Sequence, residues 1–258
     1  MTGGLMVIVA HPDDEVLIAG GTLAACAAAG TPTAVLCLTR GEQGPIADPA
    51  SVSRAQLPDV RLAELRASCA ELGVDWVKCY RRQDGYLRWS DAAAIVRQIE
   101  TVLLTRQPDA VITFGEDGLY YHPDHIATYE FALRAVRRLA NPPYLYRSVW
   151  PENLMVELTA ELARRGLPSA LWTMEPDSFG VEQEDRLNEI VLDVRAQTAR
   201  KLRALRCHRT QFGPSHAFSA IPDQLAERYL GLERFVCVTR PSDGGWLEGA
   251  LERASVRG

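Results

Sequence analysis

Short apolar segments alternate with longer segments of helical periodicity through the first half of the chain, and this alternation constrains the fold more than any other feature. Strands are predicted at residues 5–10, 33–39, 76–80 and 109–114, and helices at 16–30, 58–74, 91–107 and 122–140. Strands separated by helices form parallel sheets, because each crossover between parallel strands needs a connection of a dozen or more residues. The sequence therefore predicts an α/β fold with a Rossmann-like, mostly parallel sheet and helices on both faces.

The pattern is less regular after residue 140. Further strands are predicted at 144–150, 189–194 and 234–240, and further helices at 151–166 and 195–208, whereas 167–188 is rich in Pro, Asp and Glu. No linker, repeat or low-complexity tract divides the chain. We expect one domain over residues 1–258, with an irregular C-terminal half and a peripheral tail at about 241–258.

The composition excludes several classes of partner. The formal net charge is −5 over 258 residues, which gives no basic face for nucleic acid or for an anionic membrane. The N-terminus lacks the basic region of a signal peptide, and no window reaches about 18 uncharged apolar residues. The six cysteines form no CxxC pair, which is typical of reduced packing thiols. We therefore expect a cytoplasmic protein, and the sequence leaves a homo-oligomer open.

The first cluster of polar residues follows the first predicted strand. His11, Asp13, Asp14 and Glu15 stand in the sequence AHPDDE, between the apolar strand and a helix of small residues. Ligand crevices in open α/β sheets lie at this end of the strands. A helix N-terminus stabilises a carboxylate by about 0.3–1 kcal/mol, which is too little to hold three desolvated acids together. The cluster therefore predicts a bound cation.

A second cluster has the same setting. His122 and His125 follow the strand at 109–114, in the sequence YYHPDH, near the start of the next helix. Their spacing of three residues lets both rings face one crevice. Two histidines and a carboxylate, with water in the fourth position, make up a catalytic zinc site. Either cluster alone is more simply explained by first-turn acids or by surface or capping histidines, and it is their coincidence at two strand ends that favours a metal site.

The two motifs together resemble those of the PIG-L/LmbE-like zinc-dependent de-N-acetylases. This family removes acetyl from N-acetylglucosamine units of small glycoconjugates. The resemblance extends to residues 38–44, 61–74, 83–87 and 201–211, and it is weak over 140–188. It implies that the chain is a metal-dependent hydrolase of an N-acetylglucosamine-type amino-sugar conjugate.

The resemblance also implies how the site residues divide the chemistry. The expected ligands of one Zn²⁺ per chain, for which Fe²⁺ or Co²⁺ are substitutes, are His11, Asp14 and His125. Asp13 is the expected general base, which takes a proton as metal-bound water attacks the amide carbonyl. His122 is expected to act as electrophile or acid, with help from Tyr120. Tyr121 stands where many relatives carry glycine, so the sequence leaves open which tyrosine faces the carbonyl.

Other residues carry weaker signals. Three charged residues follow predicted strands and are expected to line the sugar site, namely Arg40, Glu42 and Asp84. A solvated loop charge explains each of them equally well. His208 matches the C-terminal motif of the family, whereas His216 has no motif support. Trp150 and Trp172 lie in the variable segment, where they either stack on a sugar or aglycone or belong to the core.

Two other functions are compatible with the same residues. The first is an amidase that cleaves a larger acyl group from a glucosamine–thiol conjugate, because the metal site does not distinguish acetyl from a bulkier acyl group. The loops at 43–57 and 144–182 are expected to form the rim that decides between these substrates. The second is a non-catalytic metal- or nucleotide-binding module. Against it, AGGTLAACAAAG lacks the spacing GxGxxG, and the acids beside it would repel a pyrophosphate.

Overall fold

The computed structural model describes residues 3–180, 188–239 and 245–255. These residues form one mixed sheet with the strand order β3-β2-β1-β4-β5-β7-β6. Its strands are β1 (Leu5–Val9), β2 (Thr33–Thr39), β3 (Trp76–Arg82), β4 (Ala110–Thr113), β5 (Tyr144–Val149), β6 (Glu189–Asp193) and β7 (Leu232–Cys237). Neighbouring strands from β3 to β5 run parallel, whereas β7 runs antiparallel to both β5 and β6.

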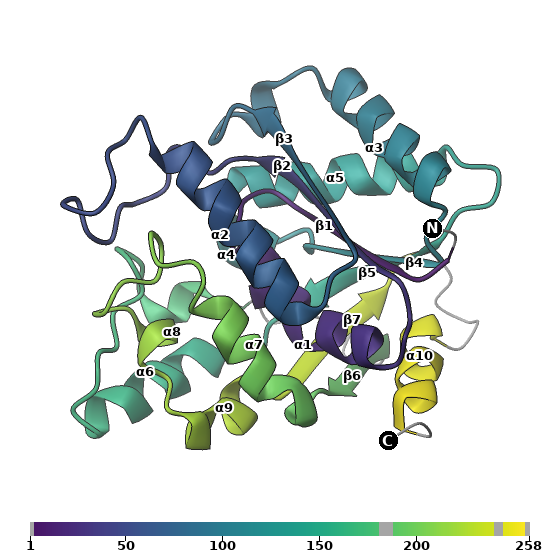
Figure 1. Cartoon of the computed structure of the whole chain (residues 1–258). Coiled ribbons are helices and arrows are strands. Elements are labelled where there is room, and N and C mark those ends of the chain that lie inside the picture. The colour runs from purple at the N-terminus through teal and green to yellow at the C-terminus, as the bar shows by residue number, and fades with distance from the viewer. Residues whose placement is uncertain (1–2, 181–187, 240–244, 256–258) are drawn as a thin grey trace.

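Helices cover both faces of this sheet, so the predicted α/β fold is confirmed. Figure 1 shows α3 and α5 on one face and α1, α2 and α7 on the other. The longer helices are α1 (Asp14–Ala28), α2 (Leu57–Leu72), α3 (Ala92–Arg106), α5 (Pro123–Arg137), α6 (Leu154–Arg164), α7 (Thr198–Leu205), α9 (Asp223–Leu230) and α10 (Trp246–Ser255). The short helices are α4 (Gly118–Tyr121) and α8 (Ala217–Ala220). Every helix among the described residues falls short of the length and apolarity that a membrane span needs.

Part of the C-terminal tail, which the sequence analysis expects to be peripheral, packs against the core through α10. Helix α10 contacts α1, and Leu247 and Ala250 are fully buried. Their spacing of three residues puts both side chains on one helical face, a pattern too short to stand out in the sequence. Of the tail predicted at 241–258 and the strand predicted at 234–240, residues 240–244 and 256–258 lie outside the described residues.

The small residues of α1 allow the chain to pack closely around it. A Cβ on Gly21 would lie 2.4 Å from Val194 Cγ2, and a Cβ on Gly20 would lie 3.2 Å from Lys201 Cγ. Real Cβ atoms do not approach a neighbour as closely as 2.4 Å, so the segment between β6 and α7 requires glycine at position 21. The glycines therefore serve helix packing here, in agreement with their lack of a phosphate-binding spacing.

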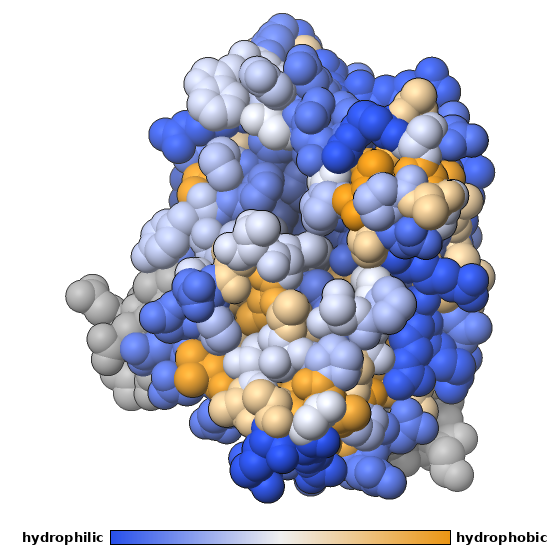
Figure 2. All heavy atoms as spheres, turned by 90° about the vertical axis from the view of Figure 1, so that its left-hand side faces the viewer, coloured by the Kyte–Doolittle hydropathy of each residue, from blue (hydrophilic) through white to orange (hydrophobic). Residues whose placement is uncertain are grey.

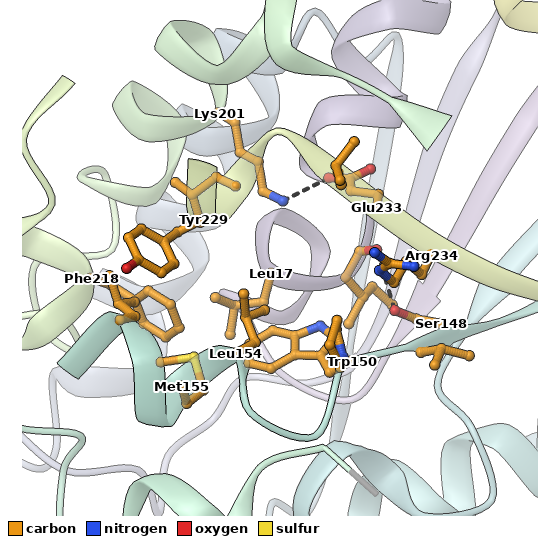
Figure 3. Close-up of a pocket in the computed structure, with 16 residues that line it drawn as sticks. Leu17, Ser148, Trp150, Leu154, Met155, Lys201, Phe218, Tyr229, Glu233 and Arg234 are labelled. Carbon is orange, nitrogen blue, oxygen red and sulfur yellow. Dashed lines mark hydrogen bonds and ion pairs between the residues drawn. The ribbon is translucent and has the colours of Figure 1, made fainter. Parts of the chain in front are cut away.

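A buried ion pair stabilises a bend in α1. The helix departs from helical geometry at Ala19, where φ is −151° and ψ is 18°. Beyond this bend the N–H groups of Gly21 and Thr22 donate to the carboxylate of Glu233, at 2.7 and 2.8 Å. Lys201 Nζ lies 2.7 Å from the same carboxylate, and Figure 3 shows this pair between α7 and β7. Glu233 thus caps the second half of α1 from across the fold.

The strand order brings the two polar clusters together. Strands β2 and β4 both pair with β1, one on each side, so the chain reverses its direction of travel across the sheet between β1 and β4. The crevice beyond the carboxyl ends of two such strands is the usual ligand site of an open α/β sheet. His11–Asp14 follow β1, and the segment from Gly115 to His122 follows β4. Both clusters therefore lie at this switch point.

The buried ion pair yields a test of the fold. Lys201 and Glu233 are 4% and 5% exposed, and removing one partner of a buried pair leaves an uncompensated charge. We expect Glu233→Ala to lower the free energy of unfolding by about 3–5 kcal/mol in a chemical denaturation experiment. The control is Glu71→Ala, which removes the exposed partner of Arg203 and should cost at most about 1 kcal/mol. Equal losses in the two variants would contradict the capping role of Glu233.

Candidate metal centre and catalytic site

A tight turn between β1 and α1 aims the first cluster at the crevice. Asp13 adopts a left-handed backbone with φ 119°, directly before the first residue of α1. The backbone N–H of His11 donates to Asp14 Oδ2 at 2.7 Å, which folds the Asp14 carboxylate back toward the histidine. The N–H of Asp13 donates to Glu15 Oε2 at 2.9 Å. These contacts fix the strained turn. Asp14 accepts the N–H of His11, and Glu15 accepts the N–H of Asp13.

The second cluster is held by the N-terminus of α5. His122 caps this helix, because its Nδ1 accepts the N–H of Asp124 at 3.2 Å, and Pro123 occupies the first turn, where a missing N–H costs nothing. His125 is 1% exposed, and its Nδ1 lies 3.1 Å from the carbonyl oxygen of Gly118. A Cβ on Gly118 would lie 3.1 Å from the Cβ of His125, so a small residue is needed there. The Nε2 atom of His125 is thereby turned toward the first cluster.

Three side chains meet at distances that suit one metal ion. His125 Nε2 lies 3.2 Å from His11 Nδ1 and 3.2 Å from Asp14 Oδ1, and His11 Nδ1 lies 3.4 Å from Asp14 Oδ2. Ligand atoms bound about 2.0–2.1 Å from a tetrahedral Zn²⁺ are about 3.3 Å from one another. The two ring nitrogens and the Asp14 carboxylate, which meets His125 through Oδ1 and His11 through Oδ2, therefore have a spacing compatible with three corners of such a site. The donor set of two imidazoles and one carboxylate also suits a divalent transition metal.

The other ring nitrogen of His11 faces two carboxylates. Its Nε2 lies 2.9 Å from Asp84 Oδ1 and 3.4 Å from Asp124 Oδ2. Asp124 is itself fixed by the N–H groups of Gly85 and Leu87, at 2.7 and 3.0 Å. His11, Asp84 and Asp124 form a second group with potential ligand atoms close together, and His11, His122 and His125 form a third. The second ring nitrogen of a metal-binding histidine commonly meets a carboxylate or carbonyl oxygen, as His11 Nε2 meets the Asp84 carboxylate and His125 Nδ1 meets the Gly118 carbonyl.

The two ring nitrogens of His11 therefore have different partners. Nδ1 faces Asp14 and His125, whereas Nε2 faces Asp84 and Asp124. Although burial opposes it, the hydrogen bond from His11 and its charge hold the pKa of Asp84 well below the usual range. An ionised Asp84 orients His11 so that Nδ1 points to Asp14 and His125. Sequence analysis placed Asp84 in the sugar site, and the structure places it both beside His11 and in the lining of the cavity.

Asp13 lies beside the three converging side chains but has a different partner. Its Oδ2 accepts a hydrogen bond from Arg61 Nη2 at 3.0 Å, and Arg61 also donates to the carbonyl oxygens of Pro12 and Gly41 at 2.6 and 2.7 Å. Burial raises the pKa of Asp13 to about 7, with Arg61 opposing the rise and Asp14 adding to it. A pKa near neutrality suits a group that takes and returns a proton, although a nearby cation would lower it.

Glu15 also stabilises the turn between β1 and α1. Its carboxylate accepts the Ser68 hydroxyl at 2.6 Å and lies 2.8 Å from His208 Nε2, while its other oxygen holds the N–H of Asp13. Glu15 and His208 are both fully buried. The C-terminal motif around His208 therefore reaches the site indirectly, through Glu15.

Sequence reasoning missed Arg61 and Asp124. Arg61 is 3% exposed and shares a face of α2 with Leu65 and Ser68, four and seven residues further on. A charged side chain in the apolar stripe of a helix is a signal that was available in the sequence. Asp124 lies within the quoted HPDH motif, but its position in the first helical turn suggests only a favourable helix charge.

A cavity of about 370 Å³ opens over the cluster. Its lining includes His11, Asp13, Asp14, Asp84, Tyr120 and His122. Residues from both predicted rim loops also line it, namely Gln43, Gly44, Pro45, Trp172, Thr173 and Met174. Figure 2 views the side of the molecule on which these strand-end loops lie and shows a hollow there with largely hydrophilic walls. The volume falls in the range of small-molecule sites, about 300–1,000 Å³.

Only some of the aromatic and charged residues that the sequence predicts for the site line the cavity. The Tyr120 ring centroid lies 5.7 Å from that of His122 and 5.2 Å from that of His125, whereas Tyr121 is 63% exposed and absent from the lining. Arg40 pairs with Asp59, and Glu42 accepts the N–H of Asp84; neither lines the cavity. The structure thus offers Arg40 and Glu42 no direct contact with a ligand in this cavity.

His216 and Trp150 lie outside the cavity lining, in agreement with the lack of a motif around His216. The His216 ring packs 4.4 Å, centroid to centroid, from Trp172, and burial lowers its pKa to about 4. Trp150 is 9% exposed and stacks on Phe179, so it belongs to the core. Trp172 is different, since it lines the cavity with its indole N–H held by the carbonyl of Gln211 at 3.2 Å.

Comparisons with known proteins identify relatives of this chain. Residues 6–136 match the PIG-L family model, which is described as GlcNAc-PI de-N-acetylase. The chain is 32% identical to a 1D-myo-inositol 2-acetamido-2-deoxy-alpha-D-glucopyranoside deacetylase from Actinosynnema mirum, over 93% of each chain.

Two solved structures share the fold. N,N'-diacetylchitobiose deacetylase from Pyrococcus horikoshii superposes with a TM-score of 0.59 at 23% identity, covering 91% of this chain and 83% of that one. The 4-carboxy-2-hydroxymuconate hydratase from Pseudomonas putida KT2440 superposes with a TM-score of 0.63 at 21% identity, covering 92% and 96%. At these identities the likeness supports the fold alone, and the function must be argued from the site.

The cluster geometry predicts the metal content of variants. We expect His125→Ala to lose most of the divalent metal that the wild-type protein carries when purified without chelator, because it removes one of the three converging ligand atoms. Asp84→Asn should keep the site but weaken metal affinity by about 10–100-fold, because it removes the carboxylate that orients His11. Elemental analysis and competition with a chelating dye measure both effects.

The matched control for these variants is His216→Asn. It replaces a buried histidine outside the cluster, and asparagine keeps an acceptor for the capped N–H of Phe218. Its metal content should equal that of the wild type. Equal metal in His125→Ala and the wild type would contradict the ligand assignment.

Proposed function

The chain belongs to the PIG-L family of de-N-acetylases, and from this membership we propose that it is a zinc-dependent enzyme that removes acetyl from an N-acetylglucosamine unit joined to a cyclic polyol. It is a deacetylase, that is, a hydrolase of an N-acetyl amide of an amino sugar. The metal, the roles of single residues and the second half of the substrate belong to the proposal. The observation that carries it is the convergence of His11 Nδ1, Asp14 and His125 Nε2 within 3.2–3.4 Å, with a second carboxylate beside them in a cavity.

We assign the metal to His11, Asp14 and His125, with Zn²⁺ as the expected ion and Fe²⁺ or Co²⁺ as substitutes. When bound, such an ion supplies Lewis-acid polarisation of the amide carbonyl and acidifies water. Asp14 suits this task because, despite its burial, the charge of His125 and the hydrogen bond from His11 hold its pKa well below the usual range. It stays ionised and directed at the two histidines.

Asp13 serves as the general base. Its carboxylate lines the cavity next to Asp14, and Arg61 donates to its Oδ2 atom. The second oxygen is then available to accept a proton from the attacking water. The proton passes on to the departing amine, which must leave as a neutral or protonated amino group. Arg61 and the hydrogen bond from Asp13 N–H to Glu15 keep the base from turning away.

His122 is suited to stabilise the oxyanion that forms as the carbonyl is attacked. Its Nδ1 accepts the N–H of Asp124, so the neutral ring carries its proton on Nε2. Burial, together with the nearby His125 and His11, lowers the pKa of His122 to about 3, so the ring is neutral at physiological pH. A neutral imidazole with its N–H directed into a cavity is an electrophile and not a proton source. Tyr120 lies next to this ring, and burial raises the pKa of its hydroxyl well above the usual range, so it keeps a proton to donate.

The second half of the substrate is inferred from the relatives and the cavity. The relative from Actinosynnema mirum is named for a substrate in which the amino sugar is linked to myo-inositol. A volume of about 370 Å³ exceeds what an acetyl group alone requires. Trp172, Met174 and Pro45 supply an apolar part of its wall, against which a ring is able to pack.

The function is tested by acetate release. We expect metal-loaded protein to release acetate from N-acetylglucosaminyl-inositol, and to do so with a higher kcat/KM than from the same conjugate carrying a larger N-acyl group. The measurement is enzyme-coupled acetate detection, with mass spectrometry of the free amine. Faster cleavage of the larger acyl group would favour the amidase alternative, and no cleavage of either conjugate would contradict the proposal.

The division between the two adjacent carboxylates is tested by paired variants. Asp13→Asn keeps size and polarity but cannot accept a proton, so kcat should fall by about 10²- to 10⁴-fold while metal content stays unchanged. Asp14→Asn removes a charged ligand, so metal affinity should fall, and excess metal should restore part of the activity. Steady-state kinetics and elemental analysis on the same preparations separate the two effects.

The control is Asp59→Asn, which makes the same substitution at an exposed acid paired with Arg40. Its kinetics and metal content should match the wild type. Similar metal loss in Asp13→Asn and Asp14→Asn, or wild-type turnover in Asp13→Asn at full metal occupancy, would show that the two carboxylates do not divide the tasks in this way.

A further inference from the structure

Two cysteines outside the catalytic machinery lie side by side on β2 and β3. Cys37 on β2 and Cys79 on β3 are register partners on adjacent parallel strands. Their sulfur atoms converge on the same carbonyl oxygen, that of Thr39, at 3.2 Å for Cys37 and 3.0 Å for Cys79. Both are free thiols. This is a paired arrangement that the scattered cysteine spacing in the sequence does not reveal.

The backbone geometry at this pair is compatible with a disulfide bond. Adjacent strands lie about 4.7–4.9 Å apart, and the Cα atoms of disulfide-bonded cysteines usually lie about 4.4–6.8 Å apart. Both side chains reach the same acceptor, so they project to the same face of the sheet. Bond formation needs rotation of the two sulfurs toward each other, and not a rearrangement of the strands.

The two thiols differ in access in a way that favours an ordered reaction. Cys37 is fully buried between neighbouring strands, whereas Cys79 is only partly buried and lies on β3, the edge strand of the sheet. The neighbouring Cys37 thiol and the charges of Arg40, Arg61 and Arg66 lower the pKa of Cys79 despite its partial burial. By contrast, burial raises the pKa of Cys207, the other partly buried cysteine. A thiolate is the attacking species in thiol–disulfide exchange, so Cys79 is the favoured entry point.

We propose that Cys37 and Cys79 form a redox-active dithiol that low-molecular-weight disulfides convert to an intramolecular disulfide between β2 and β3. The Cys79 thiolate attacks one sulfur of the small disulfide RSSR, giving a mixed disulfide and releasing RS⁻. The Cys37 thiol then attacks the Cys79 sulfur and its proton passes to the leaving RS group, which forms the Cys37–Cys79 bond and releases RSH. Two protein thiols are oxidised and one small disulfide is reduced to two thiols, so atoms and electrons balance.

Disulfide formation removes contacts of the segment that follows β2, which includes cavity-lining residues 43–45. Both S–H donors to the carbonyl of Thr39 are lost when the bond forms. Thr39 anchors the start of this segment. Its hydroxyl donates to the carbonyl of Ala10 at 2.9 Å and accepts the N–H of Gly41 at 3.1 Å. Gln43, Gly44 and Pro45 follow directly and line the cavity. We therefore expect the disulfide form to bind substrate more weakly, with KM raised several-fold and metal content unchanged.

The test uses the full-length, metal-loaded protein with oxidised glutathione as the probe. The wild type should lose two of its six free thiols and about 2 Da of mass, and peptide mapping should find the Cys37–Cys79 bond. Cys37→Ser should instead accumulate a glutathione adduct on Cys79, because the resolving thiol is absent. Cys79→Ser should form neither product at these positions. Cys207→Ser is the matched control and should form the disulfide as the wild type does.

The thiol chemistry and the proposed function are judged by different measurements. Adducts confined to Cys207, a bond that involves another cysteine, or no loss of thiols would overturn the dithiol. A Cys37–Cys79 bond with unchanged KM, reversible by dithiothreitol, would overturn its effect on the cavity. Mass and thiol counts decide the first point even for a protein without activity on the tested conjugates, so a failure of the proposed function is recognised separately.

Discussion

Three adjacent acidic residues in one buried turn set the main constraint on this structure. Asp13, Asp14 and Glu15 are 7%, 3% and 0% exposed, and burying charges without partners costs several kcal/mol per ion. Each acid is met by a different part of the chain. Arg61 from α2 meets Asp13, His125 from α5 meets Asp14, and His208 after α7 meets Glu15. The packing of these three elements around the β1–α1 turn is thus coupled to the electrostatics of the site.

The sequence was sufficient for the parts of this arrangement that depend on local pattern. The strands and longer helices of the first half, and the two histidine motifs at strand ends, follow from periodicity and from the topology that periodicity imposes. The partners of the acids do not follow from it, because Arg61 lies 48 residues from Asp13 and His208 lies 193 residues from Glu15. Only the packed fold brings such residues together.

The position of a residue after a strand predicts whether it lines the cavity less well than the direction of its side chain does. Arg40, Glu42 and Asp84 all follow strands that end at the same edge of the sheet, yet only Asp84 lines the cavity. Arg40 turns outward to Asp59, while Glu42 turns to the backbone of Asp84 and supports the residue that reaches His11. Likewise, the left-handed backbone of Tyr121, with φ 60°, separates two adjacent tyrosines so that Tyr121 is exposed and Tyr120 packs beside His122. The fold is shared with a hydratase, so the reaction depends on the directions of the side chains at the site and not on the fold.

The two neighbouring aspartates show how one turn provides opposite environments for the same chemical group. Asp14 faces two histidines, and their charge and hydrogen bonds hold its pKa well below the usual range in spite of burial. Asp13 pairs instead with Arg61, and burial raises its pKa to about 7 although Arg61 opposes the rise. Asp13 adopts a left-handed backbone directly before α1, and its carboxylate contacts Arg61, whereas the carboxylate of Asp14 contacts His125. A carboxylate held ionised between two histidines suits a metal ligand, and a carboxylate paired with Arg61 at the cavity wall suits a base, so the different partners of the two residues support the proposed division of labour.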